Sequence, residues 1–338
     1  MSDNVNSGSG KNKAAAPDPA VFSVKRYSLA GRKSKVALDK IGRPYERGGL
    51  FREFLSSLPD ILAAADLMRA AASISEAREA GRPVILGMGA HPIKVGLSPV
   101  IIDLMESGVI TAIATNGASI VHDFELAFAG YTSEDVAAEL CKGMFGMAEE
   151  TGVMLNRAIV NGVDKGLGLG KAVGSFLLHD KAVKNKEISI FARACELEVP
   201  VTVHVAIGTD IIHMHPEADG RAIGEGSLRD FRLLATLLRV LEGGVFINLG
   251  SAVIIPEVFM KALNLARNTG SSGCDKIERF TAINMDFINH YRAQVNVLKR
   301  PAGSSGAAIN LIGHHEIMFP LLAAAVKEGL KGQDLDGR

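Results

Sequence analysis

Histidines are the residues of this chain whose spacing most directly suggests chemistry. His213 and His215 follow Asp210 with one residue between them, so on an extended segment both imidazoles would point the same way. Further histidines stand at positions 204, 290, 314 and 315. Such a group can transfer protons, bind a metal ion or simply pack in the core, and spacing alone leaves all three open. We expect proton transfer from His213, His215 and His290.

Glycine-rich turns are the second candidate feature. Two apolar runs end in Gly87-Met88-Gly89-Ala90-His91-Pro92 and in Thr115-Asn116-Gly117-Ala118-Ser119. In an α/β protein such turns let the backbone approach phosphates at the start of the next helix. The first is a GxGxxG fingerprint without its third glycine and is weak alone. A third run, Gly166-Leu167-Gly168-Leu169-Gly170-Lys171, departs from the phosphate-loop spacing and is expected to be a plain loop.

The elements that must position these residues follow from the apolar pattern. Short apolar runs alternate with helical segments, as a parallel sheet covered on both faces requires. The sequence therefore predicts a doubly wound, mostly parallel, Rossmann-like α/β fold with helices on both faces. The expected strands are 84–88, 110–115, 199–207, 245–249, 280–283 and 308–312.

Helix ends are also marked in the sequence. Helical spacing of apolar residues predicts two helices between residues 50 and 80, separated at Pro59. Thr132 with Asp135, and Ser227 with Asp230, are spaced like N-caps. Gly152 and Gly243 are expected at helix C-termini, where a left-handed residue is favoured.

Composition narrows the class of protein. The 37 basic residues balance the 37 acidic ones, so the net charge provides no electrostatic attraction for nucleic acid or an anionic membrane surface. The cysteines, Cys141, Cys195 and Cys274, have no CxxC spacing, which argues against a disulfide framework or a thiolate zinc site. No apolar run approaches the roughly 20 residues of a membrane span. We expect a soluble cytoplasmic protein that acts on a small molecule or an acceptor protein.

Several segments, in order along the chain, resemble deoxyhypusine synthases. The turn at 115–124 keeps the family's aspartate as Asp123. Segment 190–210 resembles the family's helix, its next strand and a Thr-Asp pair at the strand end. Gly250-Ser251-Ala252-Val253 stands where the family has three glycines, and Phe319-Pro320-Leu321-Leu322 matches its C-terminal motif. Lys299, within 295–300, stands in the place of the family's catalytic lysine.

The resemblance implies a domain plan and a chemistry. Residues 1–20 would be a disordered tail, 21–80 an N-terminal arm with helices, and 81–330 one NAD-binding catalytic domain. The family is a cytoplasmic homotetrameric transferase in which NAD oxidises a polyamine and a lysine, here Lys299, carries the aminoalkyl group as an imine. We expect no metal ligand. Cofactor contacts are expected at Gly89, Asn116, Gly117, Ala118, Asp123, Asp210, Gly250, Ser251 and Asp286.

Departures from the family pattern leave other functions open. Val121 and His122 replace two glutamates, and Ile255 stands in a segment where the family has a lysine and two histidines. The family's acidic loop is shortened to 285–292, so the substrate is expected to be an amine that is less cationic than spermidine. A metal-assisted hydrolase or lyase using the histidines, and a non-catalytic nucleotide-binding regulator, remain alternatives.

Overall fold

A computed structural model describes residues 24–269, 277–301 and 305–330. The chain divides into two compact units, residues 1–39 and 40–338. The described part of the first unit is exposed and holds a short 3-10 helix, Leu29–Gly31, capped by Ser28. A second 3-10 helix spans Leu38–Lys40. Cys274 and the tail at residues 1–20 lie outside the described residues.

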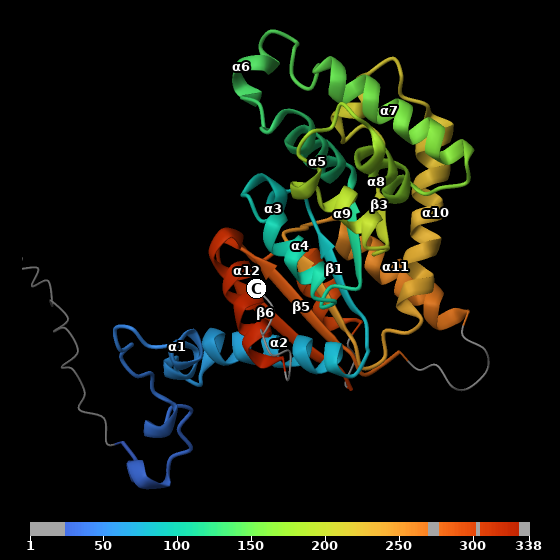
Figure 1. The fold of residues 1–338 in the computed structure, drawn as a ribbon. Coiled ribbons are helices and arrows are strands. Elements are labelled where there is room, and N and C mark those ends of the chain that lie inside the picture. The colour runs from blue at the N-terminus through green and yellow to red at the C-terminus, as the bar shows by residue number, and fades with distance from the viewer. Residues whose placement is uncertain (1–23, 270–276, 302–304, 331–338) are drawn as a thin grey trace, which may run out of the picture. The chain divides into compact units, whose positions relative to one another are not determined.

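The second unit is built on a six-stranded parallel sheet, which confirms the predicted fold class (Figure 1). Its strand order, β3-β2-β1-β4-β5-β6, is the doubly wound order of dinucleotide-binding folds. Each expected strand is present, and its ends are shifted by a few residues at most. The strands are β1 (Val84–Met88), β2 (Ala112–Asn116), β3 (Val201–His204), β4 (Val245–Leu249), β5 (Thr281–Asp286) and β6 (Ala307–Ile312).

Helices cover both faces of this sheet. The strands have apolar side chains on both faces, and these must be buried. Ile85, Phe246 and Ala282 face a core shared with α10, α11 and η5, whereas Leu86 and Ile247 face the larger core on the other side. Helices α2 and α12 pack side by side next to β6 (Figure 1). The helices are α1 (Phe51–Ser57), α2 (Leu62–Glu79), α3 (His91–Lys94), α4 (Ser98–Glu106), α5 (Gly117–Ala129), α6 (Val136–Leu140), α7 (Glu149–Asp164), α8 (Leu169–His179), α9 (Ile190–Glu196), α10 (Gly220–Leu238), α11 (Ile254–Asn268) and α12 (His315–Gly329), with the short helices η3 (Lys186–Ile188), η4 (Ile211–Met214) and the π-helical η5 (Ala293–Lys299).

An asparagine ladder fixes the register of three strands. Asn248, Asn284 and Asn310 are partners in β4, β5 and β6. The amide nitrogen of Asn248 donates to the Oδ1 of Asn284 at 2.8 Å, and that of Asn284 donates to the Oδ1 of Asn310 at 2.9 Å. A buried amide that loses its partner costs about 1–3 kcal/mol. The ladder therefore opposes any slip of one strand against the next.

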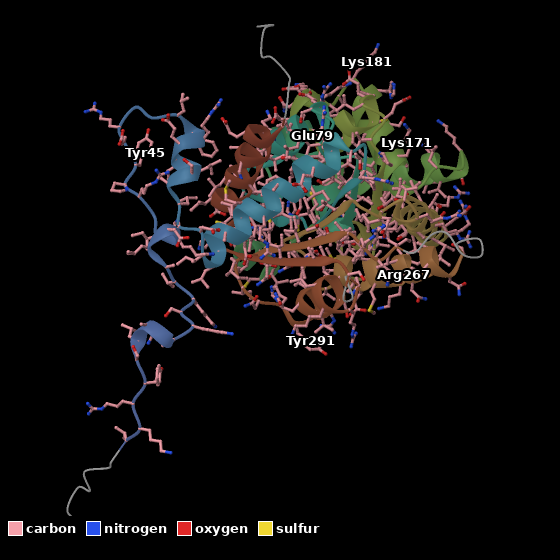
Figure 2. The ribbon with its side chains drawn as sticks, turned by 90° about the horizontal axis from the view of Figure 1, so that it is seen from below. Tyr45, Glu79, Lys171, Lys181, Arg267 and Tyr291 are labelled. Carbon is pink, nitrogen blue, oxygen red and sulfur yellow. The ribbon has the colours of Figure 1, made fainter. Side chains whose placement is uncertain are left out.

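Buried aspartates hold the starts of several helices. Asp230 accepts hydrogen bonds from the backbone N–H of Gly170 at 2.9 Å and of Val203 at 2.8 Å, and so joins α8 to β3. The Asp230 side chain thus contacts the start of α8, in the glycine-rich run 166–171 that resembles a phosphate loop. The lysine of that run, Lys171, is exposed on α8 (Figure 2).

The predicted pair Thr132 and Asp135 does mark a helix start, with Asp135 as the N-cap. The other predicted helix ends, at Ser227 with Asp230, at Gly152 and at Gly243, are wrong. Asp135 caps α6 by accepting from the N–H of Ala138 at 3.1 Å. Ser227 and Asp230 lie inside α10, whose N-cap is Asp219. Both inner residues contact β3 because they face the sheet. Gly152 lies inside α7, where its missing side chain makes room for another residue. None of the helices within the described ranges is long and apolar enough to cross a membrane.

The Asp230 carboxyl predicts a pH dependence of stability. Burial raises its pKa to about 7, against the opposing backbone hydrogen bonds from Gly170, Val203 and Leu169. The folded state therefore binds more protons than the unfolded chain between about pH 4 and pH 7, so the stability from this group falls as pH rises through that window. We expect the stability advantage of the wild type over Asp230→Asn to shrink by a few kcal/mol, in order of magnitude, from pH 5 to pH 7.5.

Urea denaturation at the two pH values measures this difference. Asp219→Asn, at the solvent-accessible N-cap of α10, is the matched control for the loss of a capping carboxylate. A wild-type advantage over Asp230→Asn that grows toward pH 7.5 would contradict the prediction.

Candidate functional site

The carboxyl ends of β1 and β4 form the switch point of the sheet, where chain connections leave in opposite directions. The N–H of Gly89 donates to the carbonyl of Leu249 at 3.0 Å. A Cβ on Gly89 would lie 2.5 Å from the carbonyl oxygen of Gly250. Gly250 has φ +65°, and its Cβ would lie 2.5 Å from the ring of His315. Both turns therefore require glycine, because each lets the backbone pack closely against its neighbour at this edge of the sheet.

A chain of titratable side chains lies beside this switch point. The Nδ1 atoms of His91 and His315 are 2.8 Å apart. The Nε2 of His315 lies 3.8 Å from one oxygen of Asp286, and the Nε2 of His290 lies 3.7 Å from the other. Phe287 packs against both rings of the histidine pair, with centroids 5.8 Å from each. We call Asp286, His315 and His91 the proton chain, in which the two histidines share a hydrogen bond and Asp286 lies beyond hydrogen-bond distance of His315.

Only one Nδ1 of the histidine pair can carry the shared proton. Burial lowers the pKa of His315, while the Asp286 carboxylate opposes that shift and His91 adds to it. His315 is therefore neutral near pH 7. If His91 donates from Nδ1, its Nε2 is left as a proton acceptor, and the Nε2–H of His315 faces Asp286. His91 is half-buried at the start of α3, whereas His315 is 1% exposed, so His91 is the end that a substrate can reach.

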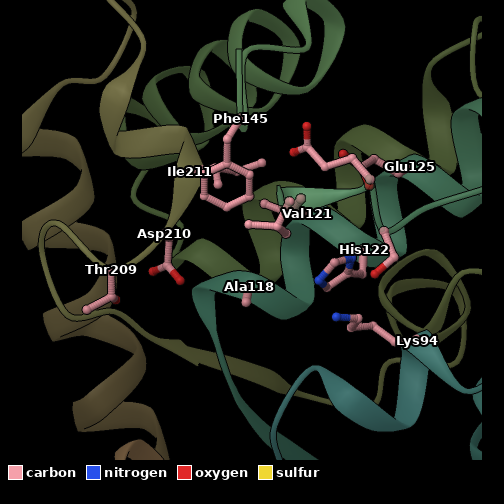
Figure 3. A pocket seen from close by; sticks show the side chains of 12 residues that line it. Lys94, Ala118, Val121, His122, Glu125, Phe145, Thr209, Asp210 and Ile211 are labelled. Atoms are coloured by element: carbon pink, nitrogen blue, oxygen red, sulfur yellow. The ribbon is translucent and has the colours of Figure 1, made fainter. Parts of the chain in front are cut away.

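A cavity of about 200 Å³ opens beside α5 (Figure 3). Lys94, His122 and Asp210 bring polar groups to it, among apolar side chains that include Val121, Phe145 and Ile211. We call this space the α5 cavity. It is smaller than the roughly 300–1,000 Å³ of pockets for drug-sized ligands. A small metabolite fits this volume better than a whole dinucleotide does.

Asp210 lies at the start of α5, on the wall of the α5 cavity. A Cβ on Gly117 would lie 2.1 Å from its Oδ2, so the glycine is what admits the carboxyl group. Burial raises the pKa of Asp210 to about 6, against a hydrogen bond from the N–H of Ala118. The side chain is 7% exposed, and its Oδ2 has no hydrogen-bond partner among the described residues.

His122 is oriented by a threonine and a glutamate. Thr132 donates its hydroxyl proton to the Oε2 of Glu125 at 2.5 Å, and Thr151 donates to the Oε1 at 3.2 Å. The Thr132 oxygen therefore accepts from the Nδ1–H of His122, at 2.7 Å. Burial lowers the pKa of His122 to about 4, with a smaller contribution from the Lys94 charge. His122 is therefore a neutral ring near pH 7, and its Nε2 can accept a hydrogen bond.

The predicted cofactor residues around α5 lie together, but several side chains are already used. Gly117 and Ala118 form the first turn of α5, next to Asp210. The Oδ1 of Asn116 caps α5 by accepting from the N–H of Ser119 at 3.2 Å. Ser251 accepts from the N–H of Ile255 at the start of α11. Gly89, Gly250 and Asp286 lie at or beside the switch point.

Asp123 has a structural position instead of the predicted cofactor contact. Its side chain is fully buried, and it accepts from the hydroxyl of Ser189 and from the N–H groups of Ile190 and Phe191. The carboxylate therefore holds the start of α9. No oxygen of Asp123 is left for a dinucleotide.

Lys299 does not lie at the crevice of its own chain. It is exposed at the end of η5, two residues before Pro301. Arg267 donates both to the carbonyl of Pro301, at 2.9 Å, and to that of Ile277, which precedes β5. These contacts place the end of η5 toward the amino-terminal edge of the sheet, opposite the strand ends that carry the site. The helix returns across the sheet and carries the lysine away from the chemistry predicted for it.

His213 and His215 do not converge as an extended segment would place them. Residues Ile211–Met214 form the 3-10 helix η4, which breaks the alternation. His213 accepts from the N–H of Gly208 at 3.2 Å, whereas the Nε2 of His215 bonds the carbonyl of Gly146 at 2.8 Å. The ring of His215 also fills the space that Gly152 leaves open on α7. The two rings are held by different segments.

The proton chain and the α5 cavity contain residues that the sequence prediction missed. Their signals were present: His91 follows the first glycine-rich turn, His315 is the second of two consecutive histidines and begins α12, and His122 replaces a glutamate of the resembled family. Nothing in the sequence indicates that His91 and His315 meet across 224 positions. Within the described residues, no group of three or more His, Cys, Asp or Glu side chains is arranged to hold a metal ion.

No model of a known protein family matches this chain, and no curated protein is significantly similar to it in sequence. Solved structures do share its fold. A mutant of AgrE bound to L-arginine matches with a TM-score of 0.50 and 16% identity, over 79% of this chain and 32% of AgrE. This chain thus spans about a third of AgrE. At this identity the likeness shows the α/β fold and nothing further.

Two further solved structures have lower TM-scores. A conserved protein of the candidate LOR/SDH type from Methanococcus maripaludis S2 matches with a TM-score of 0.49 and 17% identity, over 80% of this chain and 71% of that one. A candidate deoxyhypusine synthase from Entamoeba histolytica matches with a TM-score of 0.48 and 14% identity, over 87% and 98% of the two chains.

The pKa of His122 tests the electrostatics of the α5 cavity. We expect its imidazole to titrate well below 6.5 in the wild type, because burial and the Lys94 charge disfavour its cation. Lys94→Gln removes that charge, so the pKa of His122 should rise. Titration of the histidine ring signals by NMR measures both values. Lys171→Gln, at the exposed lysine of α8, is the matched control, and an equal shift in the two variants would contradict the assignment.

Proposed function

We propose that this chain is an NAD-dependent enzyme that oxidises an amine at the carboxyl edge of its sheet. The observation that carries the proposal is the proton chain of Asp286, His315 and His91 at the switch point of a β3-β2-β1-β4-β5-β6 sheet. In this strand order dinucleotides bind in the crevice at the switch point. A proton acceptor at the same place is what oxidation of an amine to an imine requires, because the nitrogen loses a proton while its carbon loses a hydride.

Unsatisfied polar atoms support a polar ligand at this edge. The Oδ1 of Asn248 and the Nε2 of His315 are buried without hydrogen-bond partners in the described residues. They lie at or just beyond the carboxyl ends of β4 and β6. Buried polar atoms are rarely left unpaired unless a ligand or water completes them. The residues present therefore fit a dinucleotide, with the backbone at Gly89 and Gly250 as its contact surface.

NAD, when bound, supplies the hydride acceptor. The chain's own residues accept the proton that the amine nitrogen loses when the C–N bond becomes an imine. His91 accepts this proton at Nε2, while its Nδ1–H stays hydrogen-bonded to His315. Asp286 lies close enough to stabilise the positive charge that spreads over the two rings.

AgrE supports the cofactor only by analogy of fold. It has been solved in complexes with L-arginine and with ornithine and NAD⁺. Since this chain spans a third of AgrE, the activity of that whole protein is not transferred to it. We propose the dinucleotide for this chain on its own crevice. A homo-oligomer, which the family resemblance implies, is part of the same proposal.

The proposed reaction has no covalent step at Lys299. Transfer of an aminoalkyl group through a lysine imine needs the lysine next to the substrate, and Lys299 lies toward the opposite edge of its chain. Simple oxidation of the amine to an imine needs only the hydride acceptor and the proton chain. The reaction proposed is therefore an oxidation, with no group transfer.

Variants of the proton chain test this function. NADH binding, followed by calorimetry, should be unchanged within about twofold in His91→Gln, while NAD reduction with amines falls by about 10²–10⁴-fold, the usual contribution of a general base. Lys299→Gln should keep full activity and is the matched control. A wild-type chain that binds no dinucleotide at millimolar concentration, or a His91→Gln variant of full activity, would rule out the mechanism.

A further inference from the structure

The α5 cavity presents two opposite charges that have no protein partner. Lys94 forms no ion pair in the part of the chain that the structure describes. Asp210 is 7% exposed, and its Oδ2 is unpartnered. By contrast, the other acidic residues of the wall are used: Glu125 binds two threonines, and Glu134 accepts from the N–H of Gly146 at 2.9 Å. One cation and one carboxyl group are left for a ligand.

The two free groups lie on different sides of the cavity. Figure 3 shows Lys94 on α3 next to His122, and Asp210 beyond Ala118 near the end of β3. Apolar side chains, among them Val121 and Ile211, lie between and above them. A complementary ligand therefore has an anionic end, an apolar body and a hydrogen-bond donor that is preferably cationic.

We propose that the α5 cavity binds an aliphatic amino acid as a zwitterion, with its carboxylate on Lys94 and its ammonium on Asp210. This inference goes beyond the proposed function, because His91, the proton acceptor proposed for the oxidation, is not among the residues that line the α5 cavity. A diamine would place a second cation beside Lys94. A dicarboxylate would place a second anion beside Asp210. Each of these ligands meets one like charge, whereas the zwitterion meets two opposite ones.

Burial strengthens the case for an ammonium at Asp210. A carboxyl group in this position is costly as an ion, and its pKa is raised by burial. A ligand ammonium beside this carboxyl group would supply the missing counter-charge. His122, held neutral with a free Nε2, adds a hydrogen-bond acceptor without adding charge.

Calorimetry with matched ligands tests the assignment. Aliphatic amino acids from L-alanine to L-ornithine are titrated into the full chain, and the tightest binder is compared with its decarboxylated and deaminated analogues. We expect the amino acid to bind at least about tenfold tighter than either analogue, which corresponds to one lost ion pair. Failure of every amino acid at millimolar concentration, or equal binding of either analogue, would overturn the proposal.

Two variants should each remove one of the two preferences. In Lys94→Gln, at an exposed position, the Kd of the amino acid and that of its decarboxylated amine should lie within about twofold of each other. In Asp210→Asn, the Kd of the amino acid and that of its deaminated carboxylate should lie within about twofold of each other. Lys171→Gln should leave both ratios unchanged. Unaltered ratios in Lys94→Gln would contradict the carboxylate assignment even if Asp210→Asn were unstable.

NADH binding, measured on the same samples, separates this inference from the proposed function. NADH binding without amino acid binding overturns the ligand assignment and leaves the dinucleotide function standing. Amino acid binding without NADH binding supports the cavity's ligand class and rules out the oxidation.

Discussion

Buried carboxylates at helix starts are the interactions on which the architecture of this molecule depends. Asp123 binds the start of α9, Asp210 the start of α5 and Asp230 the start of α8. Each joins segments that are far apart in sequence, and each compensates unpaired N–H groups that the core would otherwise leave without partners. The same interaction that organises the helices also shapes the site, because Asp210 accepts from the N–H of Ala118 in the first turn of α5 and forms one wall of the α5 cavity.

The fold was readable from sequence because it rests on local patterns. Runs such as Val84–Met88 and Val245–Leu249 are apolar on both faces, and only a doubly covered parallel sheet buries them. The position of a polar side chain cannot be predicted from such local patterns. Asp123 and Lys299 were assigned by resemblance, yet one is buried against α9 and the other is carried away by η5.

Site residues were missed where the contact depends on tertiary structure. His91 and His315 meet only because β1 and β6 end at the same edge of the sheet. The His213 and His215 pair failed for a local reason, since a short 3-10 helix replaced the extended segment. The candidate site thus combines a predictable place, the carboxyl edge, with side chains that could be chosen only in three dimensions.

The asparagine ladder has a consequence for how this scaffold tolerates change. Its amides tie β4, β5 and β6 at one level, just before the strand ends that carry Gly250, Asp286 and His315. Loops beyond this level can lengthen or shorten without altering where each strand stops. An inserted or deleted residue within a strand would instead shift the ladder. The three amides keep the relative register of β4, β5 and β6 constant, so that loops at this edge, and with them the substrate, can change while the strand ends stay in place.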